Sequence, residues 1–285
     1  MKTVSIIIPI YNEEKSLPKV LSDIKKIKAH NRNICEIIAV DDGSTDNSAK
    51  IVQEARIKLL RHTSNKGYGA ALKTGISAAN GEYILIIDAD GTYPVDAIPT
   101  LIKLSSKYDM VVGARTGKHV TIPLLRRPAK WILNKLANYL TDIKIPDLNS
   151  GLRIFKKDIA LRFFDLFPDG FSFTATITIA ALTNNYNVKF VPINYYKRES
   201  KSSIKPIRDF SSFFYLILRL MIYFKPAKIF LPTSAMLFII GFIKAMRDFI
   251  LFNYFGVGAV MVILTSIQLG FLGLIADLVI KRTKL

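Results

Sequence analysis

The sequence contains one cysteine, Cys35, and three histidines among its 285 residues. A single cysteine forms neither an internal disulfide nor a thiolate zinc cluster, so both kinds of stabilised fold are excluded. Cys35 lies in the apolar run 34–38 and is expected to be a small buried residue. His30, His62 and His119 show no metal-ligand spacing, and we expect them on the surface or in loops.

Acidic residues are also scarce: 22 Asp and Glu stand against 40 Lys and Arg, which gives a formal net charge of +18. A surplus of this size predicts an anionic partner, such as nucleic acid, a membrane surface or a phosphorylated substrate. The basic residues gather at 115–135 and 197–208, whereas most acidic residues lie in the first third of the chain. No nucleic-acid-binding motif accompanies the charge, so we expect no nucleic-acid partner.

A secretory signal is also lacking. The first apolar run, 4–10, is short, is interrupted by Pro9 and leads directly into Asn12, Glu13 and Glu14 without a cleavage region. We therefore expect the N-terminal part of the chain to stay in the cytoplasm.

Short apolar runs alternate with amphipathic stretches over the first two hundred residues. This pattern predicts strands at 4–10, 34–40, 57–61, 83–87 and 110–113, with helices at 13–29, 47–55, 68–79 and 95–106. Apolar strands that alternate with helices indicate an α/β fold with a mostly parallel sheet. Ligands of such sheets bind beyond the carboxyl ends of the strands, where polar motifs occur in this sequence.

Two long uncharged runs, 229–243 and 249–276, follow in the last quarter of the chain. Because a bilayer core needs about 20 apolar helical residues, the second run is long enough to span, and the first spans if it extends to Lys228 or Lys244. The aromatic and aliphatic segment before them suits the membrane interface. We therefore expect an N-terminal domain at 1–208, an interfacial amphipathic segment at 209–227 and a transmembrane hairpin at 228–281.

Basic residues flank this hairpin on both sides, at Lys225 and Lys228 and again at Lys281, Arg282 and Lys284. The positive-inside rule then predicts a multi-pass membrane protein whose two hairpin ends, and whose N-terminal domain, lie on the cytoplasmic face. The alternative is a buried helical hairpin in a soluble protein.

Paired carboxylates follow the fourth predicted strand. Asp88 and Asp90 are separated by one residue, and hard oxygen ligands of this kind suit Mg²⁺ or Mn²⁺ that also binds substrate phosphates. Asp41 and Asp42 end the second strand, where a carboxylate can accept hydrogen bonds from a ribose or a base. The alternative for either pair is a tight turn with a helix cap.

Six motifs in order resemble family 2 glycosyltransferases, in the subgroup of dolichol-phosphate mannose synthase and the bacterial polyprenyl-phosphate glycosyltransferases. They are VSIIIPIYNEE (4–14), VDDGSTDNS (40–48), NKGYGAA (65–71), IDADGTYP (87–94), VGAR (112–115) and DLNSGLRIF (147–155). The resemblance covers residues 1 to about 208. It implies a Rossmann-like GT-A fold, a nucleotide-sugar donor, Mg²⁺ or Mn²⁺, and inversion at the anomeric carbon.

The resemblance also implies roles for individual residues. The donor nucleotide would be bound by Pro9, Tyr11, Glu13, Asp41, Asp42, Lys66 and Asp88. Asp88 and Asp90 would hold the metal, and Asp90 would also take part in catalysis. The phosphate of the acceptor would be bound by Arg115, Arg126, Arg127, Ser150 and Arg153.

A mobile segment would close over the donor diphosphate through Arg198 and Lys205, with Arg198 stabilising the leaving group. Two positions depart from the family pattern. Thr92 stands where many dolichol-phosphate mannose synthases have Gln, and Ser200 stands where Gly is usual. The third contact on the metal side and the hinge of the segment therefore differ from the family.

These features predict an enzyme that transfers a hexose, glucosyl or mannosyl, from a UDP- or GDP-linked sugar to a polyprenyl phosphate. A phosphate oxygen is already anionic and needs no base; Asp90 or Asp147 is the candidate if a base assists. One alternative is a glycosyltransferase acting on another lipid or glycan, and the other is a non-catalytic, membrane-tethered nucleotide-binding protein. Membrane lipids are expected partners, and self-association through the hairpin is an open alternative.

Overall fold

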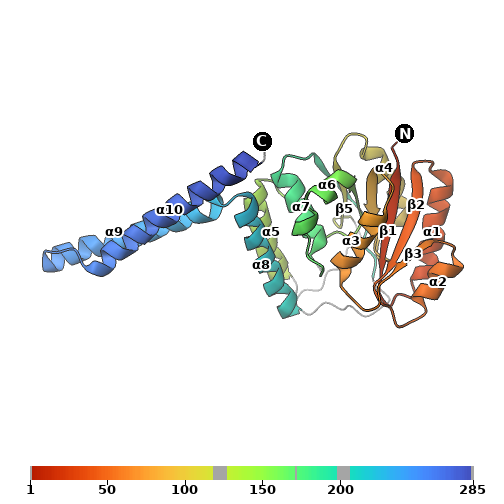
Figure 1. Cartoon of the computed structure of the whole chain (residues 1–285), viewed down its shortest axis with the longest axis horizontal. Coiled ribbons are helices and arrows are strands. Elements are labelled where there is room, and N and C mark those ends of the chain that lie inside the picture. Colours follow the sequence, from red (N-terminus) through yellow and green to blue (C-terminus); the bar gives the residue numbers. More distant parts are fainter. Residues whose placement is uncertain (1, 118–126, 171, 198–205, 284–285) are drawn as a thin grey trace. The chain divides into compact units, whose positions relative to one another are not determined.

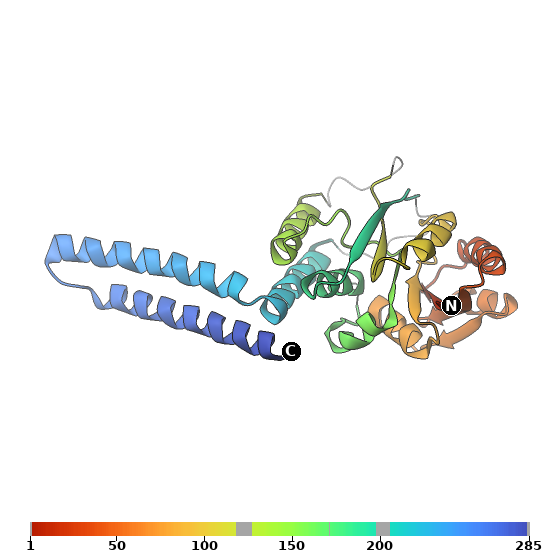
Figure 2. The same cartoon turned by 90° about the horizontal axis from the view of Figure 1, so that it is seen from above.

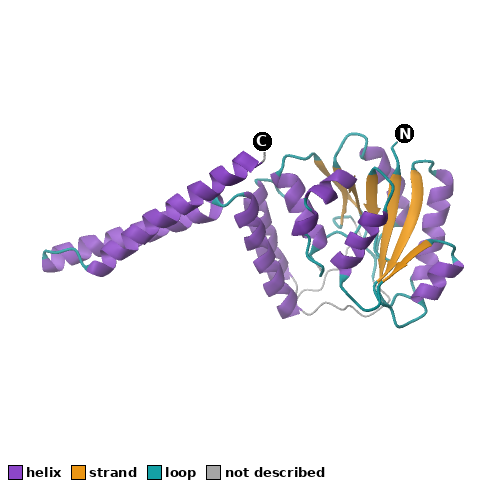
Figure 3. Ribbon diagram, in the orientation of Figure 1, coloured by secondary structure: helices purple, strands orange, loops and turns teal. Residues whose placement is uncertain are grey.

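Seven strands form one mixed sheet in the computed structural model, which describes residues 2–117, 127–170, 172–197 and 206–283 (Figure 3). The strands are β1 (Val4–Ile10), β2 (Ile34–Asp41), β3 (Lys58–Arg61), β4 (Tyr83–Ile86), β5 (Met110–Ala114), β6 (Arg153–Lys156) and β7 (Val188–Pro192). Their order is β3-β2-β1-β4-β6-β5-β7, and only β6 pairs antiparallel with its neighbours. The predicted α/β fold with a mostly parallel sheet is confirmed, and β6 and β7 are additions to it.

Helices cover both faces of the sheet (Figure 1). Ile6 and Ile8 of β1 face a core that includes α1 (Leu17–His30) and α4 (Ile98–Leu104), which follows a 3₁₀ turn at Val95–Ala97. The opposite face of β1 and β2 packs against α3 (Tyr68–Ala78). Gly75 of α3 lies directly against Ile7, so the absence of a side chain there brings the helix close to the sheet.

The other helices of this part of the chain are α2 (Ser48–Glu54), α5 (Arg127–Thr141), α6 (Lys157–Arg162) and α7 (Phe173–Thr183). Every residue of α7 is buried, including its threonines. The hydroxyls of Thr176, Thr178 and Thr183 each donate a hydrogen bond to a backbone carbonyl four residues earlier. This pattern identifies α7 as a central helix of the core.

Cys35 is exposed, and the expectation that it is buried is therefore wrong. The residue lies at the beginning of β2, whereas β3 pairs with β2 only from Ile38 onward. The strand end around Cys35 consequently has one uncovered side, although the thiol donates a hydrogen bond of 3.3 Å to the carbonyl of Val4.

The chain divides into two compact units, Met1–Phe214 and Tyr215–Leu285, and the division falls within α8 (Pro206–Phe224). The second unit contains α9 (Ala227–Phe252) and α10 (Val257–Thr283), which lie side by side as a hairpin (Figure 2). Both helices are long and apolar enough to cross a membrane, with mean hydropathies of 1.9 and 2.2 over an 18-residue window. The predicted C-terminal hairpin of two such helices is thus confirmed.

Small residues bring the two hairpin helices together. Gly241 lies against Ile263, Gly270 against Ser234 and Gly273 against Phe230. The hydroxyl of Ser234 also donates a hydrogen bond of 2.7 Å across the pair to the carbonyl of Ser266. Because apolar helices gain little from the hydrophobic effect inside lipid, close packing of this kind is the main attraction between membrane helices.

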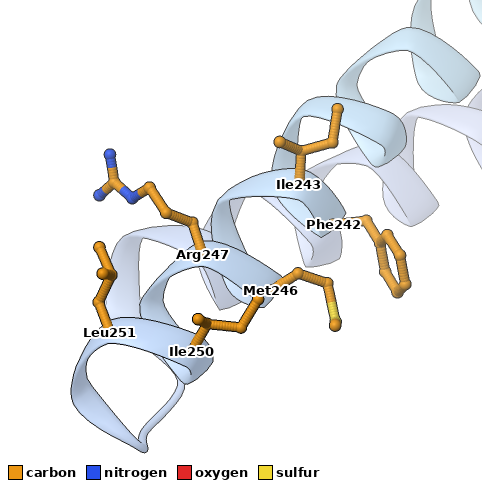
Figure 4. Close-up of a pocket in the computed structure, with 6 residues that line it drawn as sticks. All are labelled: Phe242, Ile243, Met246, Arg247, Ile250 and Leu251. Atoms are coloured by element: carbon orange, nitrogen blue, oxygen red, sulfur yellow. The ribbon is translucent and has the colours of Figure 1, made fainter.

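A shallow hollow on the side of α9 is lined by Phe242, Ile243, Met246, Arg247, Ile250 and Leu251 (Figure 4). Figure 4 shows Arg247 and Leu251 extending to one side of the helix and Phe242 to the other. The lining contains no carboxylate, and Arg247 is paired with Asp248 at 2.9 Å. The hollow therefore lacks the groups that a nucleotide or metal site needs, and its apolar surface suits contact with lipid.

Candidate active site at the carboxyl end of the sheet

The predicted donor residues follow strands whose carboxyl ends meet at one edge of the sheet. β1 is parallel to both β2 and β4, with Ile10 opposite Asp41 and Ile7 opposite Ile86. The order of connection reverses at β1, because β2 lies on one side of it and β4 on the other. Such a switch point is where open α/β sheets bind ligands.

β6 and β5 bring further residues to the same edge. Because β6 is antiparallel to β4, with Arg153 opposite Ile86, its amino end lies beside the carboxyl end of β4. β5 is antiparallel to β6, so the carboxyl end of β5 also lies there, immediately before Arg115. The sequence did not predict β6, and therefore did not predict that Gly151 lies against Asp88 or that Arg115 comes to the same edge of the sheet.

Asp88 is held between a tyrosine and a glycine. The hydroxyl of Tyr68 donates to Oδ1 of Asp88 at 2.8 Å. On the other side, Gly151 lies so close to the Asp88 carboxylate that a β-carbon would collide with it. Burial, together with the charge of Asp88, raises the pKa of Tyr68 well above its ordinary value, so its hydroxyl remains a proton donor.

Asp90 is held by its own loop. Its Oδ1 accepts hydrogen bonds from the backbone N–H of Thr92 at 3.1 Å and from the Thr92 hydroxyl at 2.6 Å. Gly91 between them has a φ of +73°, a conformation that glycine adopts readily. Thr92, which stands where many dolichol-phosphate mannose synthases have Gln, is fully buried. Its two hydrogen bonds orient the Asp90 carboxylate.

The donor set fits a divalent cation shared with a substrate. In the described part of the chain, no group of three or more His, Cys, Asp or Glu residues could hold a metal by itself. Mg²⁺ and Mn²⁺ prefer oxygen ligands, and Mg²⁺ in particular commonly takes one or two carboxylates, several waters and substrate phosphates. Asp88 and Asp90 meet that requirement if a diphosphate completes the coordination.

Asp41 is a buried carboxylate at the same edge of the sheet, paired with an arginine. The side chain is fully buried, and its Oδ1 accepts the N–H of Ser44 at 2.9 Å. Its Oδ2 lies 2.9 Å from Nε of Arg61, but no hydrogen bond reaches this atom within the described residues. A buried acceptor of this kind suits an N–H of a base or a hydroxyl of a ribose.

Loops after β1 and β2 surround Asp41. Asn12, which has a φ of +55°, accepts the N–H of Thr45 on its side-chain oxygen at 2.8 Å. Of the other predicted nucleotide residues, Pro9 is buried within β1, Glu13 is buried and Tyr11 is 42% exposed. Tyr11 is therefore the one with a ring surface available to a base.

Asp42 shapes the loop before α3. Its two carboxylate oxygens accept the backbone N–H groups of Lys66 at 2.9 Å and Gly67 at 2.8 Å. Nδ1 of His62 lies 2.6 Å from Oδ1 of the same carboxylate. His62 lies in the loop after β3, one of the two places expected for the histidines, but it is buried within that loop. The only sequence signal was its position just after β3, at the same sheet edge.

Arg115 and Asp147 form a bidentate ion pair. Nε and Nη2 of Arg115 donate to the two carboxylate oxygens at 2.7 and 2.8 Å, and the guanidinium also lies 5.1 Å from the ring centre of Tyr195. Burial lowers the pKa of Arg115, but Tyr93 and Asp147 outweigh this and raise it, so the group stays charged. Asp147 is 1% exposed and paired, which argues against its acting as a base.

Two predicted acceptor residues belong to the core. Ser150 and Arg153 are both fully buried. The guanidinium of Arg153 donates to the carbonyls of Ser150 and Thr174 and to the hydroxyl of Thr178, and burial lowers its pKa to about 10. Their described hydrogen bonds go to the protein itself, and their contact with the acceptor phosphate stays a prediction.

Four predicted residues cannot be placed in the site. Arg126, Arg198 and Lys205 lie outside the described residues, and Arg127 begins α5 with a side chain that is not described. Lys66 is exposed, and only its backbone has a described partner, Asp42.

Two family profiles and several known proteins match this sequence. The sequence profile "Glycosyl transferase family 2" matches residues 5–164, and the profile "GtrB C-terminal hairpin" matches residues 225–281. An uncharacterised protein of Methanocaldococcus jannaschii is 30% identical over 225 residues, which are 75% of this chain and 90% of that protein. A dolichyl-phosphate hexose transferase of Haloferax volcanii is 27% identical over 71% of this chain and 86% of its own length.

A solved structure supports the fold. Glucosyl-3-phosphoglycerate synthase of Mycobacterium tuberculosis, in complex with Mn²⁺, uridine diphosphate and phosphoglyceric acid, superposes with a TM-score of 0.61. The match covers 78% of each chain at 16% sequence identity. At that identity the likeness concerns the fold, and the predicted GT-A architecture is thereby confirmed.

Proposed function

The chain belongs to glycosyl transferase family 2, and from this premise we propose that it transfers a hexose from a UDP- or GDP-linked sugar to a polyprenyl phosphate. The reaction is inverting and depends on Mg²⁺ or Mn²⁺. The product is a polyprenyl-phosphate sugar. The dolichyl-phosphate hexose transferase among its relatives supports the acceptor class, and the Mn²⁺ and uridine diphosphate bound by the solved fold neighbour support the donor side.

One observation carries this proposal: a pair of carboxylates suited to a cation and an arginine suited to a phosphate lie at the same edge of one sheet. Asp88 and Asp90 follow β4, Arg115 follows β5, and only β6 separates these two strands. A cation with a diphosphate suits the first group, and a phosphate monoester suits an arginine. A neutral hydroxyl acceptor would instead require a general base and no arginine.

The chain's own residues then have distinct tasks. Asp41 and Tyr11 bind the nucleoside, and Asp88 and Asp90 hold the diphosphate end of the donor through the cation. The cation, when bound, neutralises charge on the departing diphosphate. Asp147 uses Nε and Nη2 of Arg115, which leaves Nη1 to contact the acceptor phosphate.

Positioning accounts for most of the proposed catalysis. A phosphate oxygen of the acceptor attacks the anomeric carbon, forming the new C–O bond while the bond to the donor diphosphate breaks on the opposite face. Because the attacking oxygen is already anionic, no proton has to be removed. A single displacement of this kind inverts the anomeric configuration.

The hairpin supports a site at the membrane surface. Its profile match and its two long apolar helices favour an anchor that crosses the bilayer twice. The basic residues that flank it favour the cytoplasmic face for the catalytic domain. Arg126 and Arg127 as further acceptor contacts, and Arg198 and Lys205 as donor diphosphate contacts, remain part of this proposal.

A transfer assay tests the proposed function. Full-length protein in detergent is given polyprenyl phosphate, Mn²⁺ or Mg²⁺, and radiolabelled UDP- and GDP-hexoses in turn. We expect label in the organic phase from one donor, and its loss with EDTA. Label on a lipid without phosphate would redirect the proposal to another acceptor, and nucleotide binding without any transfer would favour the non-catalytic alternative.

Gly151→Ala is expected to lower the transfer rate by about a hundredfold. A β-carbon at this position collides with the Asp88 carboxylate and forces it to move, and a displacement of about 1 Å in a catalytic group costs about this much. The matched control is Gly170→Ala, because a β-carbon there meets nothing within 4 Å. Equal transfer rates in the two variants, with both still folded, would show that Asp88 tolerates displacement.

A further inference from the structure

The family resemblance implies no role for Tyr68, yet its hydroxyl contacts Asp88 of the acidic pair. We propose that Tyr68 is a positioning residue that holds Asp88 in the orientation needed to bind the divalent cation. The identity of the cation and of the diphosphate rests on the proposed function, whereas the contact itself rests on the geometry.

The direction of the hydrogen bond is fixed by chemistry. An ionised carboxylate only accepts hydrogen bonds, so the hydroxyl of Tyr68 must donate to Oδ1 of Asp88 across their 2.8 Å separation. The contact thus fixes one oxygen of the carboxylate against the tyrosine hydroxyl.

Tyr68 is itself held firmly, because it begins a helix whose first turn is anchored. The N–H of Gly69 donates to the carbonyl of Gly170 at 3.0 Å, and the N–H of Ala70 donates to the carbonyl of Asp169 at 2.9 Å. Just before the helix, the N–H of Gly67 donates to Asp42. These bonds occupy the amino end of α3, so its contribution to the site is the tyrosine.

Together Tyr68 and Gly151 restrict Asp88 from two sides. Gly151 lies against the carboxylate, and the Gly151 N–H donates to the hydroxyl of Tyr93 at 2.6 Å, which fixes the glycine in turn. A carboxylate held in this way loses little rotational freedom when a cation binds. Without the Tyr68 hydroxyl, Asp88 gains freedom that cation binding must then remove.

Tyr68→Phe tests the proposal by removing one oxygen atom. Mn²⁺ binding by the full-length protein in detergent is measured by electron paramagnetic resonance of the free ion, in the presence of UDP and, separately, of GDP. We expect the Mn²⁺ affinity to fall about tenfold, since a hydrogen bond to a charged group has about that effect. Binding of the same nucleotides in EDTA is expected to remain unchanged, because the nucleoside contacts do not involve Tyr68.

Tyr83→Phe is the matched control. Tyr83 begins β4, the strand that Asp88 follows, is 1% exposed, and uses its hydroxyl to accept a hydrogen bond from Lys2 at 2.8 Å. Its loss is expected to leave Mn²⁺ affinity unaltered. Equal Mn²⁺ affinities for the wild type and Tyr68→Phe would overturn the proposal. If the wild-type protein bound the nucleotides with the same affinity with and without Mn²⁺, both this inference and the proposed metal dependence would be overturned.

A double variant separates positioning from a general structural effect and remains informative if the single variant is destabilised. Gly151→Ala displaces Asp88 from the opposite side without altering Tyr68. If Tyr68 acts through Asp88, adding Tyr68→Phe to Gly151→Ala is expected to change Mn²⁺ affinity by less than about twofold. A further tenfold loss would show that Tyr68 acts elsewhere and would overturn the proposal.

Discussion

Asp90→Asn is expected to lower the rate of hexose transfer by two to three orders of magnitude, roughly the effect of removing one stabilising group from a charged transition state. The amide oxygen of Asn can still accept the two hydrogen bonds that Thr92 donates to Asp90. The loop is therefore expected to keep its shape, and the loss is one of charge. The measurement is the initial rate of label transfer to polyprenyl phosphate at increasing Mn²⁺ concentration.

Asp96→Asn provides the control for this variant. Asp96 lies in the 3₁₀ turn that follows the same loop, and its side chain is exposed. Its neutralisation changes the net charge equally without reaching the site, so the rate is expected to stay at the wild-type value. A wild-type rate in Asp90→Asn, together with transfer that survives EDTA, would contradict the proposed use of the acidic pair.

Arg115→Ala is expected to reduce both stability and transfer. The variant leaves Asp147 charged, 1% exposed and without its guanidinium partner, and breaking a buried pair in this way costs about 3–5 kcal/mol. Transfer is expected to fall at least about a hundredfold, with a higher KM for polyprenyl phosphate, because the acceptor loses its arginine. Thermal unfolding, kcat and the KM for polyprenyl phosphate are measured on the same preparation.

A neutral pair distinguishes these two effects. Arg115→Met combined with Asp147→Asn removes both charges, so most of the lost stability is expected to return. Transfer is expected to remain low, since no guanidinium faces the acceptor. Recovery of transfer along with stability would show that Arg115 serves the fold alone. Lys156→Met is the control, because it breaks a more exposed ion pair with Asp109 at the opposite end of β6. It is expected to change neither the stability nor the transfer rate.

The sequence predicted the strands that build the donor side with good accuracy. β1 has the predicted bounds, and β2 and β4 differ from prediction by one residue at their carboxyl ends. These strands are continuous apolar runs bounded by polar motifs, and such runs are determined locally. The first helix was placed too early, because α1 begins only at Leu17, beside Pro18. In the loop before it, the N–H groups of Asn12 and Glu13 donate to the hydroxyls of Ser44 and Ser48.

The acceptor side was harder to predict because its contacts join distant segments. Arg115 meets Asp147, and Arg153 meets Thr174 and Thr178, only because β6 inserts antiparallel between β4 and β5. An arginine in a basic protein suggests a ligand contact when its burial is unknown. The structure shows that Arg153 is completely enclosed, whereas Arg115 keeps some exposed surface.

The sequence alone determined the chemistry that is present: two carboxylates one residue apart, a surplus of basic residues after them, and two apolar helices at the end. These features depend on residue type and short spacing, which a linear pattern records. Only the tertiary structure decided how the carboxylates are held, with Tyr68 and Gly151 flanking Asp88 and Thr92 supporting Asp90. Those partners are set by strand order and by close backbone approach, which no local pattern in the chain encodes.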